Sequence, residues 1–290
     1  MAVLGGGFIG SESAAALKLQ FKDQQDVHMI YMEKFPMARQ LGDSVGEYLA
    51  SEHAKHGVRL YPQRKVAEIK GNGRRATAVV LDDGSEIQAD LVLVGAGVLP
   101  ATKFLEGSGV QLDRWGAVVC DPFLQSSAKD VFAAGDICSY PYWLTGQQQR
   151  IEHYVSAMDQ GSHAAFNMMG KLVPFGTVPF YWTRHYNKSI QYAGFAAEYD
   201  EVHITGSLDE GKFVAFYAKD GKVRAVAGSM QSAAVLTFME AMHQNLMPSL
   251  ADLKSGKETW ETVRAKLKSN KGASKCKREH CCHKKPATTA

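Results

Sequence analysis

The sequence predicts an α/β fold, with a Rossmann-like nucleotide-binding domain at the N-terminal end and an α+β domain at the C-terminal end. Three observations predict it. A glycine-rich turn at residues 5–10 joins an apolar strand-like run to a helical segment, and a second strand-like run follows, which is a βαβ pattern. Two turn signals then divide residues 66–97 into the runs of a small β-meander. Beyond Pro179, strand-like runs joined by short turns indicate an antiparallel sheet.

The first domain is expected to contain three short strands and two helices. Its strands are expected at residues 2–4, 27–32 and 58–60, with the first helix at 11–21. Ser44 and Glu47 have the spacing of a capping box, which predicts that the second helix begins there and runs to about His56. Gly57 suits the left-handed conformation that ends a helix. The continuous apolar run at 91–94 predicts a strand buried on both faces.

The remaining elements follow from the same patterns. The run VFAAGDIC at 131–138 predicts a further short strand, and residues 152–169 predict an amphipathic helix closed by Gly170. Asp220-Gly221 is a strong signal for a tight hairpin turn. The C-terminal strands are expected at 189–196, 202–206, 212–218 and 223–228, and the C-terminal helices at 232–244 and 249–254.

Composition is ordinary for a soluble globular protein, with 45% hydrophobic and 22% charged residues in 290. No apolar run approaches the roughly 20 residues of a membrane span, and the start lacks the charged region of a signal peptide. Residues 271–290 hold six Lys or Arg and one Glu, a charge of +5, so the other residues carry −2 of the total +3. We therefore expect a disordered basic tail and no specific nucleic-acid partner.

The five cysteines do not form the pattern of a disulfide framework, which favours a reducing compartment. Cys120 and Cys138 lie alone in the body of the chain, without a C-x-x-C pair, so a dithiol relay is not expected. The remaining cysteines accompany two histidines in the tail: Cys276, His280, Cys281, Cys282 and His283. These are zinc-ligand residue types, but their spacing is unlike that of known zinc sites. We therefore expect no metal site in this chain.

The glycine turn carries the clearest chemical signal. Gly5, Gly7 and Gly10 fit G-x-G-x-x-G, in which glycines permit a tight turn, a close approach to a pyrophosphate and close helix–strand packing. Glu33 follows the second strand, 23 residues after Gly10, where a carboxylate accepts from ribose hydroxyls. Dinucleotide binding is predicted on this context. Because a carboxylate there repels a 2′-phosphate, NADH is favoured over NADPH, although Arg39 lies nearby.

Several motifs in order give a wider resemblance. GGGFIGSE, EKFP, ADLVLVGAGVLPAT, VFAAGDI and IEHYVSAMDQGSHAAFNMMG lie between about Val3 and Leu267. The chain resembles the FAD-dependent pyridine nucleotide-disulfide oxidoreductases, most closely their apoptosis-inducing-factor-like and ferredoxin-reductase-type branch. The resemblance implies an NAD-binding domain with a β-meander at 1–93, the remaining part of an FAD-binding domain at 94–172, an α+β domain at 173–270 and the tail at 271–290. It also implies that the first half of the FAD domain is missing, so a truncated or split protein is expected.

The resemblance also implies a set of residues that bind FAD and NAD(H). They are Gly5, Gly7, Phe8, Ile9, Gly10, Glu12, Glu33, Gly95, Gly97, Asp136, Glu152, His153 and Trp182. Glu12 would lie near the nicotinamide carboxamide, and Gly95 and Gly97 close to the nicotinamide. Asp136 would bind the ribitol or pyrophosphate region of FAD. Glu152 and His153 precede a helix that would approach the isoalloxazine, which Trp182 would approach from the C-terminal domain.

Each of these residues also has a purely structural interpretation. Glu12 could be an acid that a helix N-terminus favours, and the two glycines a turn at a strand end. Asp136 could be a helix N-cap, His153 a buried histidine with its hydrogen bonds satisfied, and Trp182 a core residue.

The function implied is hydride transfer from NADH to FAD, followed by electron transfer to an external acceptor such as an iron–sulfur protein. The cofactors would carry the chemistry, so no catalytic side chain is expected. The alternative is a non-catalytic NAD-binding interaction or signalling protein. A homodimer through the C-terminal sheet is possible on this interpretation, and the compartment is expected to be cytoplasmic or mitochondrial.

Overall fold

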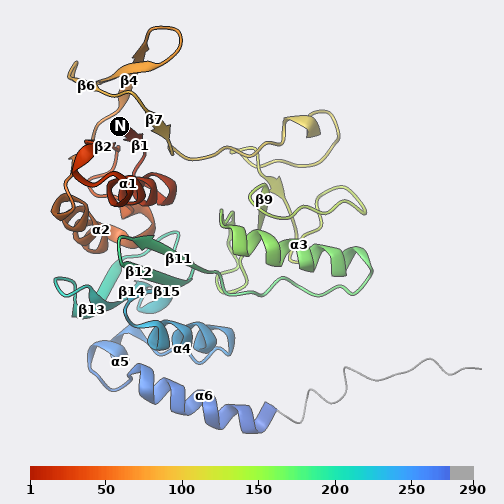
Figure 1. The fold of residues 1–290 in the computed structure, drawn as a ribbon. Coiled ribbons are helices and arrows are strands. Elements are labelled where there is room, and N and C mark those ends of the chain that lie inside the picture. The colour runs from red at the N-terminus through yellow and green to blue at the C-terminus, as the bar shows by residue number, and fades with distance from the viewer. Residues whose placement is uncertain (275–290) are drawn as a thin grey trace, which may run out of the picture.

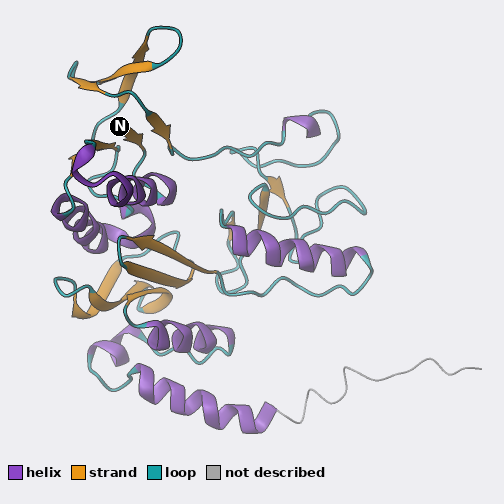
Figure 2. Ribbon diagram, in the orientation of Figure 1, coloured by secondary structure: helices purple, strands orange, loops and turns teal. Residues whose placement is uncertain are grey.

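The computed structural model describes residues 1–274, with side chains described to Asn270. The N-terminal unit lies above the C-terminal unit in one stack, and a smaller lobe stands beside this stack (Figure 1). Figure 2 shows that this lobe consists largely of loop. The architecture is the predicted α/β fold with an antiparallel C-terminal sheet. No helix within residues 1–274 is long and apolar enough to cross a membrane.

The N-terminal unit is a four-stranded parallel sheet in the order β3-β2-β1-β7. Its strands are short and buried where they meet the helices, as expected for βαβ units. The strands are β1 (Ala2–Leu4), β2 (Val27–Ile30), β3 (Val58–Tyr61) and β7 (Val92–Val94). The helical segments are α1 (Phe8–Phe21), the 3₁₀ turn η1 (Lys22–Gln24) and α2 (Ala38–Lys55).

The second helix does not begin at the predicted capping box. It begins at Ala38, after Met37 in the left-handed conformation, and is kinked at Gly42, where φ is 76°. The Met37 N–H donates to the Gly6 carbonyl at 2.7 Å, so a contact with the glycine loop sets where α2 begins. At the other end Gly57 has φ of 78°, as predicted for a helix-ending glycine.

Strand β7 is an edge strand rather than a fully buried one. It pairs only with β1, and Val94 is 63% exposed. The residues of β7 are half-buried or exposed, so the prediction of a strand buried on both faces was wrong. The predicted β-meander precedes it, as β4 (Val66–Gly71), β5 (Ala76–Leu81) and β6 (Glu86–Gln88).

The lobe contains the three-stranded sheet β10-β9-β8 and the helix α3. Its elements are η2 (Lys103–Leu105), β8 (Val118–Val119), β9 (Cys138–Pro141), β10 (Gln148–Gln149) and α3 (Tyr154–Met168). The predicted strand at 131–138 is not formed, because the chain turns at Gly135 and β9 begins only at Cys138, whose N–H donates to the Gly135 carbonyl. Gly170, with φ of 79°, follows α3 as predicted.

The C-terminal unit is a five-stranded antiparallel sheet in the order β11-β12-β15-β14-β13 with three helices. Its strands are β11 (Phe180–His185), β12 (Lys188–Gly194), β13 (Glu201–Ser207), β14 (Lys212–Lys219) and β15 (Lys222–Ser229). Its helices are α4 (Ser232–His243), α5 (Leu250–Lys254) and α6 (Trp260–Ser274). Asp220-Gly221 forms the predicted hairpin turn, with both φ angles positive.

Two elements of this unit were not predicted. Strand β11 was missed although its aromatic residues and alternating burial are typical of a strand, and α6 because polar residues surround its few buried ones. Helix α6 also continues to Ser274, past the predicted start of the tail at 271. The rest of the predicted tail, with Cys276, His280, Cys281, Cys282 and His283, lies outside the described residues.

The C-terminal sheet has helices on both faces. Leu41, Val45 and Leu49 of α2 pack on one face against Phe213 and Tyr217 of β14. On the other face, α4 and α6 bury Phe238 and Leu267 against Val214 and Phe216 of β14. The N-terminal and C-terminal units therefore share one hydrophobic core across α2, which fixes them against each other.

Candidate functional site

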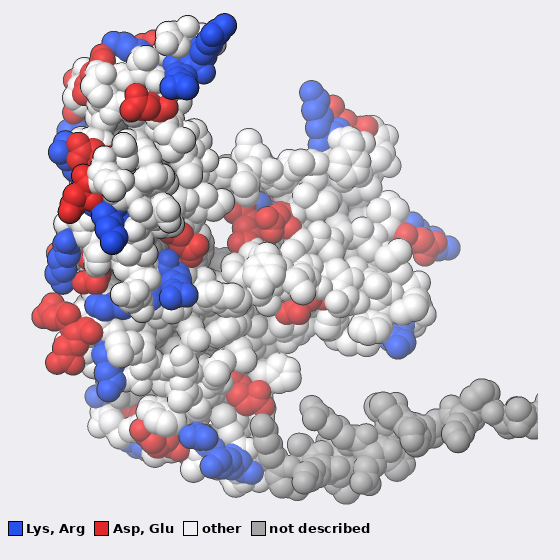
Figure 3. All heavy atoms as spheres, in the orientation of Figure 1, with Lys and Arg blue, Asp and Glu red and all other residues white. Residues whose placement is uncertain are grey.

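One cavity of about 950 Å³ lies where the N-terminal unit, the lobe and β11 meet. Figure 3 shows the molecule hollowed between the stack and the lobe. Twelve of the thirteen predicted cofactor-binding residues line this cavity. Gly10 alone does not. The structure thus brings together segments that lie up to about 170 residues apart, although their cofactor contacts stay a prediction.

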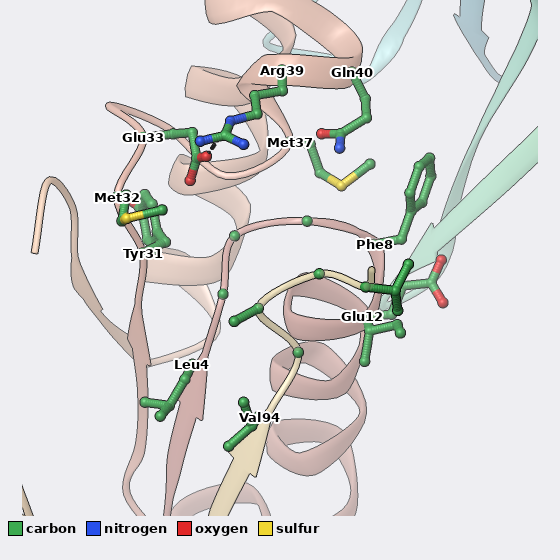
Figure 4. A pocket seen from close by; sticks show the side chains of 18 of the residues that line it. Leu4, Phe8, Glu12, Tyr31, Met32, Glu33, Met37, Arg39, Gln40 and Val94 are labelled. Atoms are coloured by element: carbon green, nitrogen blue, oxygen red, sulfur yellow. Dashed lines mark ion pairs between the residues drawn. The ribbon is translucent and has the colours of Figure 1, made fainter. Parts of the chain in front are cut away.

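The glycine loop forms the middle of the cavity wall (Figure 4). A Cβ added at Gly5, where φ is 116°, would lie 2.2 Å from the Gly95 carbonyl oxygen, and one at Gly10 would lie 1.9 Å from the Gly5 carbonyl oxygen. A Cβ at Gly7 would meet nothing closer than 4.0 Å. Gly5 and Gly10 are therefore required by protein packing, whereas Gly7 leaves room in the cavity for a ligand against the N-terminus of α1.

Two more predicted glycines, Gly95 and Gly97, line the cavity next to the glycine loop. Gly95 donates its N–H to the Leu4 carbonyl at 2.7 Å, which places the turn after β7 directly beside the glycine loop. Gly97 has φ of 100° and no atom within 4 Å of an added Cβ. Beside them Ile9 is 60% exposed to the cavity, and Phe8 packs edge-on against Tyr181.

Glu33 and Arg39 form an ion pair at one end of the cavity. Arg39 Nε lies 2.6 Å from Glu33 Oε1, and Figure 4 shows the two side chains meeting above the loop. Arg64 also lines this end, and its guanidinium is 2.9 Å from Asp83. The carboxylate that would accept from a ribose is thus already paired with a cation.

Glu12 lies at the other end and faces β11. Its Oε1 accepts from Thr183 Oγ1 at 2.6 Å and from the Arg184 N–H at 3.3 Å. Because α1 begins at Phe8, Glu12 lies in the second turn, so the interpretation as an acid held by the helix N-terminus does not apply.

The lobe contributes His153, which is the N-cap of α3. Its Nδ1 accepts from the Val155 N–H at 3.3 Å, so the ring proton of the neutral imidazole resides on Nε2. Burial lowers the pKa of His153, with Asp136 and Glu12 opposing this shift. Its ring lies 5.1 Å from that of Tyr181 and 6.5 Å from that of Trp182, measured between centroids. A neutral, oriented imidazole therefore faces the cavity.

Asp136, Glu152 and Trp182 complete the wall. Arg150 forms an ion pair with Glu152 and donates to the Asp136 carbonyl oxygen. Asp136 is exposed in a turn where no helix begins, and Trp182 is 45% exposed, so neither the N-cap nor the core interpretation applies to them.

Sequence reasoning missed several lining residues. They are chiefly Met37, Gln40, Arg64, Lys65, Tyr154 and Arg184. Of these, only Tyr154 directly follows a predicted residue, His153, and Arg184 lies two positions after Trp182. This closeness in sequence is the signal that could have found them. The others face the cavity through the fold of α2 and of the segment after β3, and no local motif marks them.

Comparison with protein families shows to which family the chain belongs. Residues 1–161 match the model of the pyridine nucleotide-disulphide oxidoreductases, and residues 180–257 match that of the reductase C-terminal domain. The chain belongs to the pyridine nucleotide-disulphide oxidoreductase family. The predicted resemblance is confirmed, including its apoptosis-inducing-factor-like and ferredoxin-reductase relatives.

The alignments with individual relatives cover most of this chain. It is 38% identical over 226 residues to human apoptosis-inducing factor 3, covering 78% of this chain and 37% of that protein. It is 32% identical to rhodocoxin reductase of Rhodococcus erythropolis, covering 74% of this chain and 49% of that one. The ferredoxin reductase structure from Rhodopseudomonas palustris has a TM-score of 0.80 at 27% identity, covering 87% of this chain and 61% of that chain. The chain thus spans half or less of these two curated relatives.

Proposed function

We propose that this chain is the NADH-binding and flavin-facing part of a flavoprotein oxidoreductase. Such a protein would transfer hydride from NADH to FAD and then pass electrons to an iron–sulfur protein. The observation that carries the proposal is the single cavity in which the G-x-G-x-x-G loop and Glu33 meet Asp136, His153 and Trp182. An NAD-only module would need no second set of residues on the facing lobe.

The residues present fit both cofactors. The open space at Gly7 beside the α1 N-terminus suits a pyrophosphate, and Glu33 would accept from the adenosine ribose. Asp136 and the N-terminus of α3 would hold FAD, which supplies the hydride-accepting and electron-donating chemistry when bound. The chain itself would orient the nicotinamide through Glu12 and exclude water with Tyr154 and Trp182. No side chain needs to move a proton.

The acceptor proposed is a ferredoxin-like protein. A relative in Sphingomonas, 30% identical over 226 residues, is a ferredoxin–NAD(P)⁺ reductase, but this chain covers only 53% of it. A one-electron acceptor also agrees with the described cysteines, Cys120 and Cys138, which are buried free thiols outside the cavity lining.

Visible absorbance tests the proposal directly. The purified full chain, incubated with FAD and desalted, is expected to retain flavin absorbance that NADH bleaches in the absence of oxygen. Asp136→Asn should retain less flavin while still binding NADH, whereas Asp130→Asn, an exposed aspartate of the same lobe, should behave as the unsubstituted chain. A colourless protein on which NADH has no effect would contradict the enzyme proposal.

The second candidate is a non-catalytic NAD-binding interaction protein. It is favoured by the similarity to apoptosis-inducing factor 3. Calorimetry separates the two candidates. NADH binding without any FAD binding would favour the second, and binding of both would favour the oxidoreductase.

A further inference from the structure

The hairpin formed by β11 and β12 is attached to α1 by polar contacts in which Glu12 lines the cavity and the other partners lie outside its lining. Consecutive residues of α1 bind alternate residues of β11. Glu12 accepts from Thr183 Oγ1 at 2.6 Å, and Ser11 Oγ lies 2.8 Å from His185 Nε2. Because side chains alternate along a strand, Thr183 and His185 face α1 together, and Trp182 on the other face lines the cavity.

Helix α2 extends the same network. His53 Nε2 lies 2.9 Å from Ser11 Oγ, and His53 Nδ1 lies 2.8 Å from the Tyr186 hydroxyl. The His56 ring stacks on Tyr186 with 3.6 Å between the centroids. Three elements that are distant in sequence, α1, α2 and the hairpin, therefore meet at one serine hydroxyl.

The hydrogen bonds of Ser11 fix the state of both histidines. Ser11 and His53 have no exposed surface and His185 is 3% exposed. The hydroxyl has one proton, so it donates to one Nε2 and accepts from the Nε2–H of the other. The two rings are then neutral and in different tautomers, and burial lowers the pKa of each. Rotating the His53 ring would break its contacts with both Ser11 and the Tyr186 hydroxyl, so this ring is held in one geometry. The His185 ring is held through Nε2 alone, because its buried Nδ1 has no partner.

We propose that Ser11, His53, Thr183 and His185 form a polar clasp that positions Trp182 and Arg184 relative to Glu12, at the nicotinamide end of the cavity. None of the four clasp residues lines the cavity, so they are positioning residues. Attachment of the two units does not depend on them, because the α2 core already joins the sheet to the N-terminal unit. What the clasp adds is orientation. This inference rests on the proposed binding of NADH.

Two ligands separate positioning from general stability. NADH would occupy the whole proposed site, whereas ADP-ribose lacks only the nicotinamide ring and would leave the end beside Glu12 and Trp182 empty. Ser11→Ala leaves two imidazoles without their shared partner, and Thr183→Val removes only a hydroxyl at constant shape. We expect either substitution to weaken NADH binding about fivefold or more, by calorimetry on the full chain, and ADP-ribose binding less than about twofold. Ser229→Ala, which removes another buried hydroxyl in the same sheet, is the matched control and should change neither.

Several outcomes would contradict the proposed positioning role of the clasp. If both variants bind NADH as the unsubstituted chain does, or if NADH and ADP-ribose weaken equally, the clasp does not position the nicotinamide end. If the unsubstituted chain binds ADP-ribose but no NADH, the clasp has no coenzyme to position. If it binds neither ligand, the proposed function fails as well. Loss of thermal stability without a change in the ratio of the two affinities would show a structural contribution only and would overturn the proposal.

Discussion

The ion pair of Glu33 and Arg39 sets the charge at the end of the cavity that we propose for the adenosine. A carboxylate alone would repel a 2′-phosphate, but here an arginine neutralises it. Glu33→Gln removes the repulsion and frees Arg39 for an added phosphate. We expect the NADPH affinity to rise about tenfold relative to that of NADH, which corresponds to about 1.4 kcal/mol. Arg39→Gln should shift the ratio the other way. Calorimetric affinities for both coenzymes check this, and an unchanged ratio in both variants would be inconsistent with it.

Gly10 is required by packing rather than by ligand contact. An alanine there places its Cβ 1.9 Å from the Gly5 carbonyl oxygen, which forces the coenzyme loop to move. Gly10→Ala should therefore destabilise the fold by about 1–3 kcal/mol and abolish NADH binding. Gly161 lies in α3, and a Cβ added there would meet nothing within 4 Å. Gly161→Ala should therefore raise the free energy of unfolding by about 0.5–1 kcal/mol, because alanine has the higher helix propensity. Urea unfolding of both variants measures the contrast, and equal effects would refute the steric explanation.

Among single residues, the sequence predicted a tight turn at the loop glycines, because that turn depends on local backbone geometry, and the structure forms it. Binding of a coenzyme by these glycines and Glu33 stays a prediction. It could not show that Arg39 pairs with Glu33, or that Glu12 binds Thr183. The first depends on where α2 begins, and the second joins residues 171 positions apart.

Helix α2 is the element that joins the two units. Leu49 is 2% exposed between α2 and the C-terminal sheet, so Leu49→Ala should lower the free energy of unfolding by about 2–5 kcal/mol. Leu19→Ala on α1, where the side chain is 47% exposed, should cost much less. Urea unfolding curves measure both. A small effect at Leu49 would mean that the shared core contributes little to stability.

Elements with strong local sequence signals were predicted correctly. Features that depend on contacts with other elements were not. The helix at 152–169 and the hairpin at Asp220-Gly221 follow from periodicity and turn chemistry. The start of α2 depends on a hydrogen bond from Met37 to Gly6, and the exposure of Val94 depends on β7 lying at an edge.

For the whole molecule, the buried histidines predict sensitivity to acid. The pKa of His53 is lowered to about 3 and that of His185 to about 4, chiefly by burial. The neighbouring titratable groups are His56 and Tyr186 at close range and Glu52, which raises the pKa of His53 in part. Since both folded-state values lie below the unfolded value of 6.5, the unfolded chain binds more protons between pH 6.5 and about 4.

Stability should therefore be fully present above pH 6.5 and fall as the pH is lowered. Each histidine contributes a slope of up to about 1.4 kcal/mol per pH unit in that window. Urea unfolding at pH 7 and pH 5 measures the loss, and His53→Gln should reduce it. His243→Gln, at an exposed histidine of α4, should leave the loss unchanged. Equal stability at both pH values would contradict the assignment of neutral buried histidines.

The sequence by itself determined the glycine loop, the family motifs and the α/β class, because glycine geometry, periodicity and turn chemistry act over a few neighbouring residues. Only the tertiary structure decided which of those motifs face one another. Packing of α2 on the C-terminal sheet brings β11 beside α1, and the turn after β7 carries the chain to the lobe that holds His153. Those contacts join residues more than a hundred positions apart, and their free energy comes from burial in the assembled core, which no local pattern records.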